Sequence, residues 1–266
     1  MYPFRSNHAA ARLVALLGVA VLATACSSDS PTGPGSSQFD VSGAIGQMTV
    51  PGMSSAMGAV PNASTADVSA PAIVPSACSY SSSTQSFTCP TVTTNGLTIT
   101  RSYTLLDAQG QPQSAPDKAT TDGVKTAITI SGTTALRTGS MTVYGDRVMT
   151  LSGLLANKPV LNGKDTTAMK GTMTMSGTSV PVDMSVTTLT NALQLPPKGS
   201  ATKYPLGGSV AMTFTSTGFM GSTPMTETMN MAFDGTSTAT MTLTDALGTQ
   251  TCKIDLTGQT AMSCKP

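Results

Sequence analysis

The stretch Leu97-Thr-Ile-Thr-Arg-Ser-Tyr-Thr-Leu105 decides the fold of this chain. Mostly apolar side chains take its odd positions, and hydroxyl side chains take its even positions. Successive side chains of an extended strand point to opposite faces, so a period of two gives one apolar face and one polar face. The stretch therefore predicts a half-buried β-strand.

The same alternation recurs along the chain after Cys78. The further runs are Ile128 and Ile130; Met141 and Val143; Met149 and Leu151; Met173 and Met175; Val182, Met184 and Val186; Val210, Met212 and Phe214; Met229, Met231 and Phe233; Met241 and Leu243; Ile254 and Leu256. Short turns at Asn162-Gly163, Asp234-Gly235 and Ala246-Leu-Gly248 favour antiparallel hairpins in sequence order. We expect residues 78–266 to form a single all-β domain, an antiparallel meander of roughly ten strands.

A sheet of this size must cover its apolar face, and twisted open sheets of many strands curl or split. The possible forms are a barrel, a half-barrel closed by N-terminal helices, or a sandwich. We favour the curled meander, barrel or half-barrel, because a sandwich usually has a more irregular strand order and a tighter aromatic core. Residues 188–204, which include Pro196 and Pro197, interrupt the alternation and are expected to form a long loop across one end.

The beginning of the chain has the pattern of an export signal. Arg5 and Arg12 precede an apolar run of 13 residues, 13–25, whereas a membrane-spanning helix needs about 20. Small residues at positions 23–25 stand directly before Cys26, and this arrangement resembles the lipobox of bacterial lipoproteins. The resemblance implies that residues 1–25 are a signal peptide that is removed, and that Cys26 is lipidated. The alternative is an ordinary secretory signal followed by an incidental cysteine.

Two polar segments follow the leader. Residues 26–37 hold no apolar side chain larger than proline after Cys26, which predicts a flexible tether. Residues 38–77 are rich in Ala, Gly, Ser and Pro, and their weak helical spacing predicts one or two short helices interrupted by prolines. The lipoprotein resemblance implies an exported protein held in the bacterial cell envelope by its lipid anchor, with the bilayer as its partner. Ser27 after the lipidated cysteine favours the outer membrane under the enterobacterial sorting rule.

Four cysteines remain after the leader is removed, and export permits disulfides. They allow three connectivities. We favour Cys78 with Cys89 and Cys252 with Cys264, because each pair flanks an expected turn, at residues 81–84 and 257–260. A metal or redox site would require close C-x-x-C spacing or histidine partners, which the sequence lacks.

Composition excludes several classes of function. Removal of Arg5 and Arg12 with the leader reduces the 14 basic residues to 12, against 13 acidic ones. Only 4% of the residues are aromatic, and there is no Trp. The sequence therefore lacks the excess of basic residues and the aromatic residues for stacking that are typical of a nucleic-acid-binding protein. The only histidine is His8 in the leader, which removes histidine-based hydrolysis and most zinc or iron sites. No phosphate-binding loop is present. We expect no enzymatic activity and no cofactor.

The acidic residues do not suggest a catalytic pair, because most are expected near turns, where Asp is common. Those that follow Cys78 are Asp107, Asp117, Asp122, Asp146, Asp165, Asp183, Glu227, Asp234, Asp245 and Asp255.

Methionine and threonine are the unusual residues. The sequence has 17 Met, and the groups Met173 and Met175; Met225, Met229 and Met231; Met48, Met53 and Met57 are similar to thioether clusters that bind Cu(I). Methionine also fills the apolar face of a strand, and we favour this packing role over a metal site. The T-x-T spacing within residues 236–244 is similar to that of ice-binding surfaces, but Thr is ordinary on the wet face of a strand.

Two hypotheses for function remain. The first is a structural or surface-interaction lipoprotein that presents a face rich in Thr and Ser to envelope partners. The second is a binding module that holds a lipid or another hydrophobic ligand in the sheet interior, as β-clam carriers do by architecture. We favour the first.

Overall fold

The computed structural model describes residues 74–136, 139–175, 178–217, 224–246, 248–256 and 262–265. All of them belong to the unit formed by residues 63–266. The predicted signal peptide, the tether and the expected helices before residue 74 lie outside the described residues.

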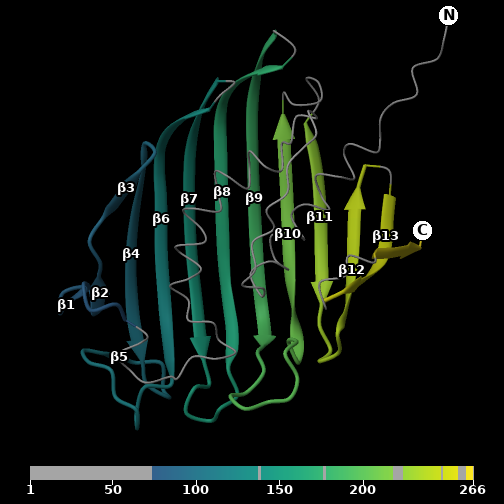
Figure 1. The fold of residues 1–266 in the computed structure, drawn as a ribbon. Helices are drawn as coiled ribbons and strands as arrows, with labels where there is room; N and C mark the ends of the chain where they lie inside the picture. The colour runs from purple at the N-terminus through teal and green to yellow at the C-terminus, as the bar shows by residue number, and fades with distance from the viewer. Residues whose placement is uncertain are drawn as a thin grey trace, which may run out of the picture. The chain divides into compact units, whose positions relative to one another are not determined.

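The described residues form one antiparallel sheet and contain no helix (Figure 1). Its strands are β1 (Ser79–Ser81), β2 (Ser86–Thr88), β3 (Val92–Thr94), β4 (Leu97–Leu106), β5 (Pro112–Gln113), β6 (Gly123–Leu136), β7 (Gly139–Ser152), β8 (Val160–Met175), β9 (Thr178–Gln194), β10 (Gly207–Thr217), β11 (Met225–Ala232), β12 (Thr238–Asp245), β13 (Gly248–Asp255) and β14 (Met262–Lys265). The expected all-β class is confirmed.

The strands lie side by side almost entirely in sequence order. The order in space is β1-β2-β4-β6-β7-β8-β9-β10-β11-β12-β13-β14, and the short strands β3 and β5 both pair with β4. Every pairing is antiparallel, so the expected meander is confirmed. β1 and β14 are the two ends of this order, so the sheet does not close into a barrel, consistent with a half-barrel.

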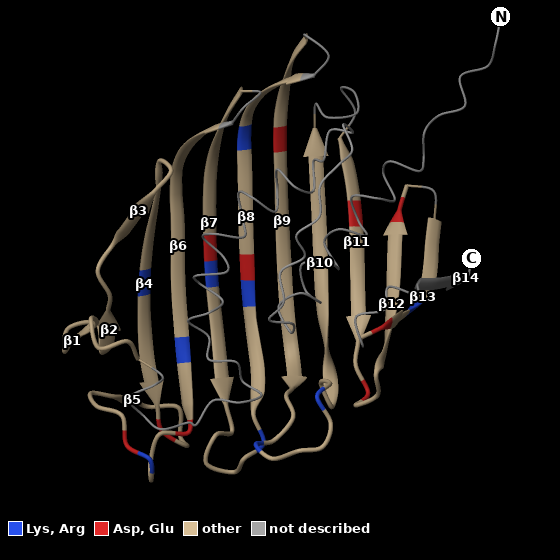
Figure 2. Ribbon diagram, viewed as in Figure 1, with Lys and Arg blue, Asp and Glu red and all other residues tan. Residues whose placement is uncertain are grey.

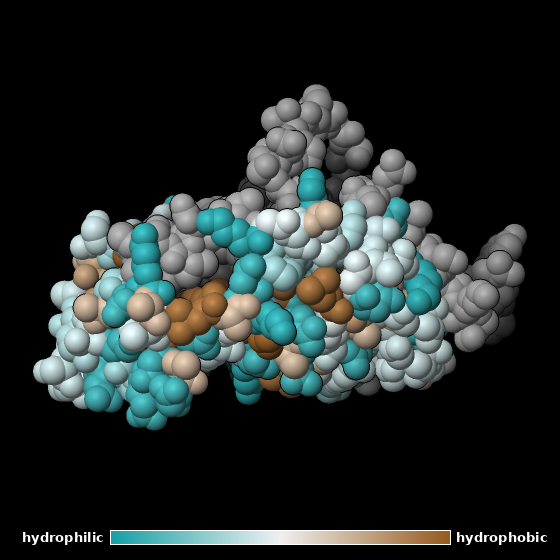
Figure 3. Space-filling model, turned by 90° about the horizontal axis from the view of Figure 1, so that it is seen from below, coloured by the Kyte–Doolittle hydropathy of each residue, from teal (hydrophilic) through white to brown (hydrophobic). Residues whose placement is uncertain are grey.

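One face of the sheet carries the core, and we call it the inner face. The burial pattern along β11 alternates between buried or half-buried and exposed residues, and the first half of β7 shows the same alternation. Figure 3 looks at the sheet from below, where hydrophobic residues gather between paler and hydrophilic ones. The buried apolar side chains that the strands contribute are Leu97, Ile99, Tyr103, Leu105, Val124, Ile128, Met141, Val143, Leu151, Met169, Met173, Val182, Met184, Leu193, Val210, Met229, Met231, Ala239, Met241, Cys252 and Ile254.

The expected turn at Asn162-Gly163 is wrong, because both residues lie inside β8. The register between β8 and β9 shifts between Leu161 and Gly163, and Asn162 Oδ1 accepts a hydrogen bond of 2.7 Å from the backbone N of Ala192. A Cβ at Gly163 would lie 2.4 Å from the Sδ of Met149, so this glycine permits close strand approach instead of a turn.

The tight Asn-Gly turn is elsewhere, between β3 and β4. Asn95 and Gly96 both have positive φ, 50° and 78°, as a two-residue hairpin turn requires. The expected loop at residues 188–204 is also displaced, because β9 continues to Gln194 and the connection to β10 spans residues 195–206.

Candidate functional site

Charged side chains are sparse on the long strands, and Figure 2 shows that most of each strand is uncharged. Four neighbouring strands nevertheless place a charged row on the inner face. Arg101 of β4 lies opposite Ile128 of β6, Ile128 lies opposite Arg147 of β7, and Arg147 lies opposite Asp165 of β8. On its strand, each of the three charged residues lies an even number of positions away from apolar residues that are buried or half-buried. Side chains at such a spacing point to the same face, so the charged side chains face the core.

Arg147 and Asp165 neutralise each other. Arg147 Nε donates a hydrogen bond of 2.6 Å to Asp165 Oδ2, and Arg147 Nη2 donates to the same oxygen. The two side chains are only 15% and 19% exposed, so little water competes with the pair.

Arg101 and Tyr103 differ from this pair because they have unused donors. Tyr103 is 1% exposed. Among the described residues, no group accepts a hydrogen bond from its Oη or from Arg101 Nε, although both atoms are buried. Burial raises the pKa of Tyr103, while the positive charge of Arg101 acts in the opposite direction, so the hydroxyl keeps its proton at neutral pH.

We call Arg101, Tyr103, Arg147 and Asp165 the polar centre. Its charges are two guanidinium groups and one carboxylate. Tyr103 also belongs to an apolar cluster with Val74, Leu105, Val124 and Leu151, so the centre borders a hydrophobic part of the same face.

A carboxyl group lies further along the inner face, on β11. Glu227 is 5% exposed, and its Oε2 has no hydrogen-bond partner among the described residues. Its Cα partner on β10 is Phe214. Burial raises the pKa of Glu227, and the negative charge of Asp245 raises it further. The expectation that acids lie mostly near turns is therefore wrong for Asp146, Asp165, Asp183 and Glu227, which lie inside strands.

The opposite face, which we call the outer face, carries a transverse row of threonines. Cα pairing across nine adjacent strands aligns one outer-face residue from each, and all but one of them are threonine. The row is Thr100, Thr129, Asp146, Thr166, Thr187, Thr213, Thr228, Thr244 and Thr249. Every member is exposed or half-buried, so the threonine row is an accessible hydroxyl surface.

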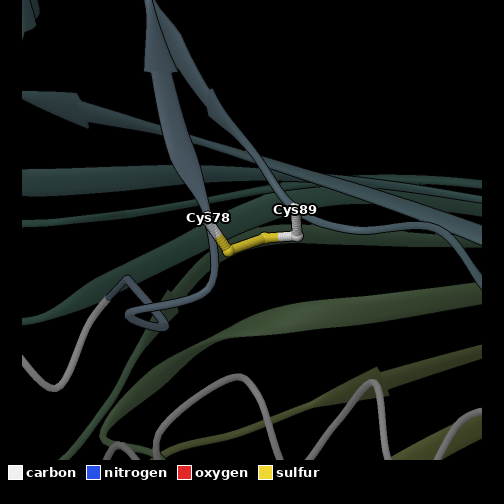
Figure 4. Close-up of a disulfide and its surroundings, with 2 residues drawn as sticks. All are labelled: Cys78 and Cys89. Carbon is white, nitrogen blue, oxygen red and sulfur yellow. A yellow bond between two sulfur atoms is a disulfide. The ribbon is translucent and has the colours of Figure 1, made fainter.

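The predicted cysteine sites are only partly within the described residues. Cys78 and Cys89 form a disulfide that joins the two ends of the β1–β2 hairpin, as expected (Figure 4). Cys252 takes part in a disulfide and lies opposite Cys264 in the β13–β14 pairing. The bond between Cys252 and Cys264 stays a prediction. Cys26 lies outside the described residues.

The methionines lie along the buried face. Met173, Met229, Met231 and Met241 are each at most 6% exposed and belong to β8, β11 and β12. Met231 lies opposite Met241, but all four side chains are buried, and burial favours packing over a copper site at an exposed rim. Within the described residues, His, Cys, Asp and Glu form no group of three or more that could hold a metal ion. Nor does this part of the chain contain a helix long and apolar enough to cross a bilayer.

The polar centre was not expected from the sequence, although the alternation of side chains along its strands places these residues on the core-facing side. Arg101 stands at an odd position of the very stretch that predicts the fold, among the residues assigned to the dry face. Comparison with known proteins finds no family model, no curated protein and no solved structure that matches the chain.

Proposed function

We propose that this protein is a lipid-anchored component of the bacterial cell envelope that presents its outer face to an uncharged envelope partner. The leader supports the anchor, because small residues followed by Cys26 resemble a lipobox. The threonine row supports the surface role.

The chemistry of the row determines which partner fits. Each threonine offers a hydroxyl that both donates and accepts hydrogen bonds, beside a methyl group. Asp146 is the one charged member, so the row has little electrostatic attraction for a polyanion or polycation. A partner with many hydroxyl or amide groups and little charge complements such a surface.

The anchor is tested by the Cys26→Ser variant. Loss of the acylated residue should release the exported protein from the membrane fraction, or leave it uncleaved. Fractionation followed by mass spectrometry of the N-terminus measures both outcomes. Wild-type membrane partitioning of a variant whose leader has been cleaved would contradict a lipid anchor at Cys26.

The surface role is tested by the binding of the Cys26→Ser protein to isolated envelopes. Glutamate at Thr187 and Thr213 adds two charges to the middle of the row, so sedimentation with envelopes should fall severalfold. Thr172→Glu combined with Thr174→Glu is the matched control, because both residues are exposed on β8 but lie outside the row. Equal binding by the double variant and the control would contradict a role of the row.

A second function is favoured by one observation. Polar groups with unused hydrogen-bonding capacity are buried on a sheet face that is mostly apolar. Native proteins usually satisfy such groups, and a bound molecule is one way of doing so. We therefore also propose that the inner face holds a hydrophobic or amphiphilic ligand. Organic extraction of protein purified from its native membrane, followed by mass spectrometry, should find a stoichiometric ligand in addition to the anchor lipid.

A further inference from the structure

We infer that the outer face binds a neutral glycan, and that Tyr144 and Asp146 of β7 form the centre of the binding surface. The inference rests on the first proposed function, contact between the outer face and an uncharged envelope partner. It adds the chemical class of the partner and the two residues that recognise it.

Tyr144 places an aromatic ring on the outside of a sheet face that is otherwise rich in hydroxyl groups. It is 53% exposed, more than any other large hydrophobic side chain in the described part of the chain. It is also the only aromatic residue on the outer face of the described strands from β4 to β13. Its Cα partners are Ser131 on β6 and Ala168 on β8, and these small side chains leave the ring accessible as an apolar platform.

Asp146 places an unpaired carboxylate beside this ring. It is exposed, and it is the one charged member of the threonine row. The described residues form two ion pairs, and neither includes Asp146. Lys164 and Lys170 share the outer face of the neighbouring strand β8, but Lys170 pairs with Asp183 instead. The oxygens of Asp146 therefore remain available as hydrogen-bond acceptors.

The spacing of the two side chains suits one sugar unit. Tyr144 and Asp146 are separated by one residue on β7, so they point to the same face about 7 Å apart along the strand. A hexose ring has C–H groups on its faces and hydroxyl groups around its rim. A ring that stacks on Tyr144 can direct a hydroxyl group toward Asp146, where a charge-assisted hydrogen bond forms.

The surroundings of Asp146 favour a glycan over other partners. Its Cα partners in the threonine row are Thr129 and Thr166, whose hydroxyl groups both donate and accept hydrogen bonds. A polyanion would be repelled by the carboxylate, and a hydrocarbon surface would leave the carboxylate and the hydroxyl groups without partners. A chain of neutral sugars offers apolar faces to the ring and hydroxyl groups to the row.

Variants of the two residues test the inference in the full-length Cys26→Ser protein, measured by its sedimentation with isolated envelopes. Tyr144→Ala should lower the affinity about tenfold, whereas Tyr144→Phe keeps the ring and should bind like the wild type. Asp146→Ala should also lower the affinity about tenfold, and Asp146→Asn should lose less because its amide oxygen still accepts a hydrogen bond. Tyr80→Ala is the control, because Tyr80 is an exposed tyrosine on β1, far from β7 in the strand order.

Treatment of the envelopes identifies the kind of partner. Periodate cleaves the vicinal diols of hexose chains, and lysozyme cleaves chains of N-acetylated amino sugars. We expect one of these treatments to reduce sedimentation severalfold, and the effective treatment distinguishes the two kinds of glycan. Digestion of the envelope proteins with a protease should leave binding unchanged.

Failure of the glycan inference differs from failure of the surface role. If the Cys26→Ser protein does not sediment with envelopes, the surface role is wrong, and the glycan inference falls with it. Loss of binding after protease digestion, or full binding after both glycan treatments, overturns the glycan inference and leaves the surface role standing. Wild-type binding by both Tyr144→Ala and Asp146→Ala would likewise overturn the inferred site.

Discussion

Arg147 and Asp165 join β7 to β8 through an ion pair on the inner face, with 2.6 Å between Arg147 Nε and Asp165 Oδ2. Breaking a buried pair from one side leaves an uncompensated charge, whereas replacing both partners with apolar residues is often nearly neutral. We predict that Asp165→Leu alone lowers the free energy of unfolding by about 3 kcal/mol. The double variant Arg147→Met with Asp165→Leu should recover most of this loss. Urea unfolding measures both, and a double variant as unstable as the single one would contradict the argument.

Glu227 makes stability depend on pH in a direction opposite to that of most carboxyl groups. Its pKa is raised in the folded protein, so the folded state binds more protons than the unfolded state between the ordinary and the raised pKa. Stability is therefore highest below the ordinary pKa and decreases as pH rises through the raised one. Glu227→Gln should remove this decrease and stabilise the protein at pH 7. Unfolding curves of both proteins between pH 4 and pH 8 check the prediction, with Asp146→Asn on the exposed outer face as the control.

The disulfide between Cys78 and Cys89 closes a loop with a sequence separation of 11. The chain-entropy model gives about 2.5 to 3 kcal/mol for a bridge of this length. We predict that Cys78→Ser combined with Cys89→Ser lowers the free energy of unfolding by this amount.

Peptide mapping of the oxidised wild type should also find Cys252 linked to Cys264. A peptide that joins Cys78 to either of these cysteines would refute both pairings.

Met231 and Met241 lie opposite each other on β11 and β12, and both are buried. Leucine has nearly the same volume as methionine, so Met231→Leu should cost less than about 1.5 kcal/mol. The affinity of the protein for Cu(I) should not change, because the sulfur serves packing. A large loss of Cu(I) binding with an intact fold would instead identify the methionines as ligands.

The fold was predictable because the period of two survives along almost every long strand. Leu97, Ile99, Tyr103 and Leu105 are all buried on one face, as their odd positions indicate. The dipeptide Asn162-Gly163 suggested a turn, but glycine is also found where two strands approach closely. Only the pairing of Gly163 with Met149 on the neighbouring strand shows that the glycine has this second role. In the same way, the register between strands that are far apart in the sequence determines which polar residues lie next to each other.

The polar centre was not predicted for the same reason. Arg101 and Arg147 are separated in the sequence by a whole strand, and the row that contains them exists only after Ile128 is placed between them. Arginine at a core-facing position is tolerated because its aliphatic stem packs against apolar neighbours, and the head of Arg147 in addition pairs with Asp165. Parity alone shows where such a residue points, but not which partner it finds.

The two ends of the strand order have a consequence for how copies of this protein behave when they are crowded. β1 and β14 have only three and four residues, whereas the central strands β8 and β9 have 16 and 17. An exposed strand of that greater length would offer a long row of free backbone donors and acceptors to the next copy, and such edges promote polymerisation. Short terminal strands, one of them held in a disulfide-closed hairpin, limit this template to a few residues. In the part of the chain that the structure describes, the sheet thus offers a neighbouring copy only short edges on which to add a strand.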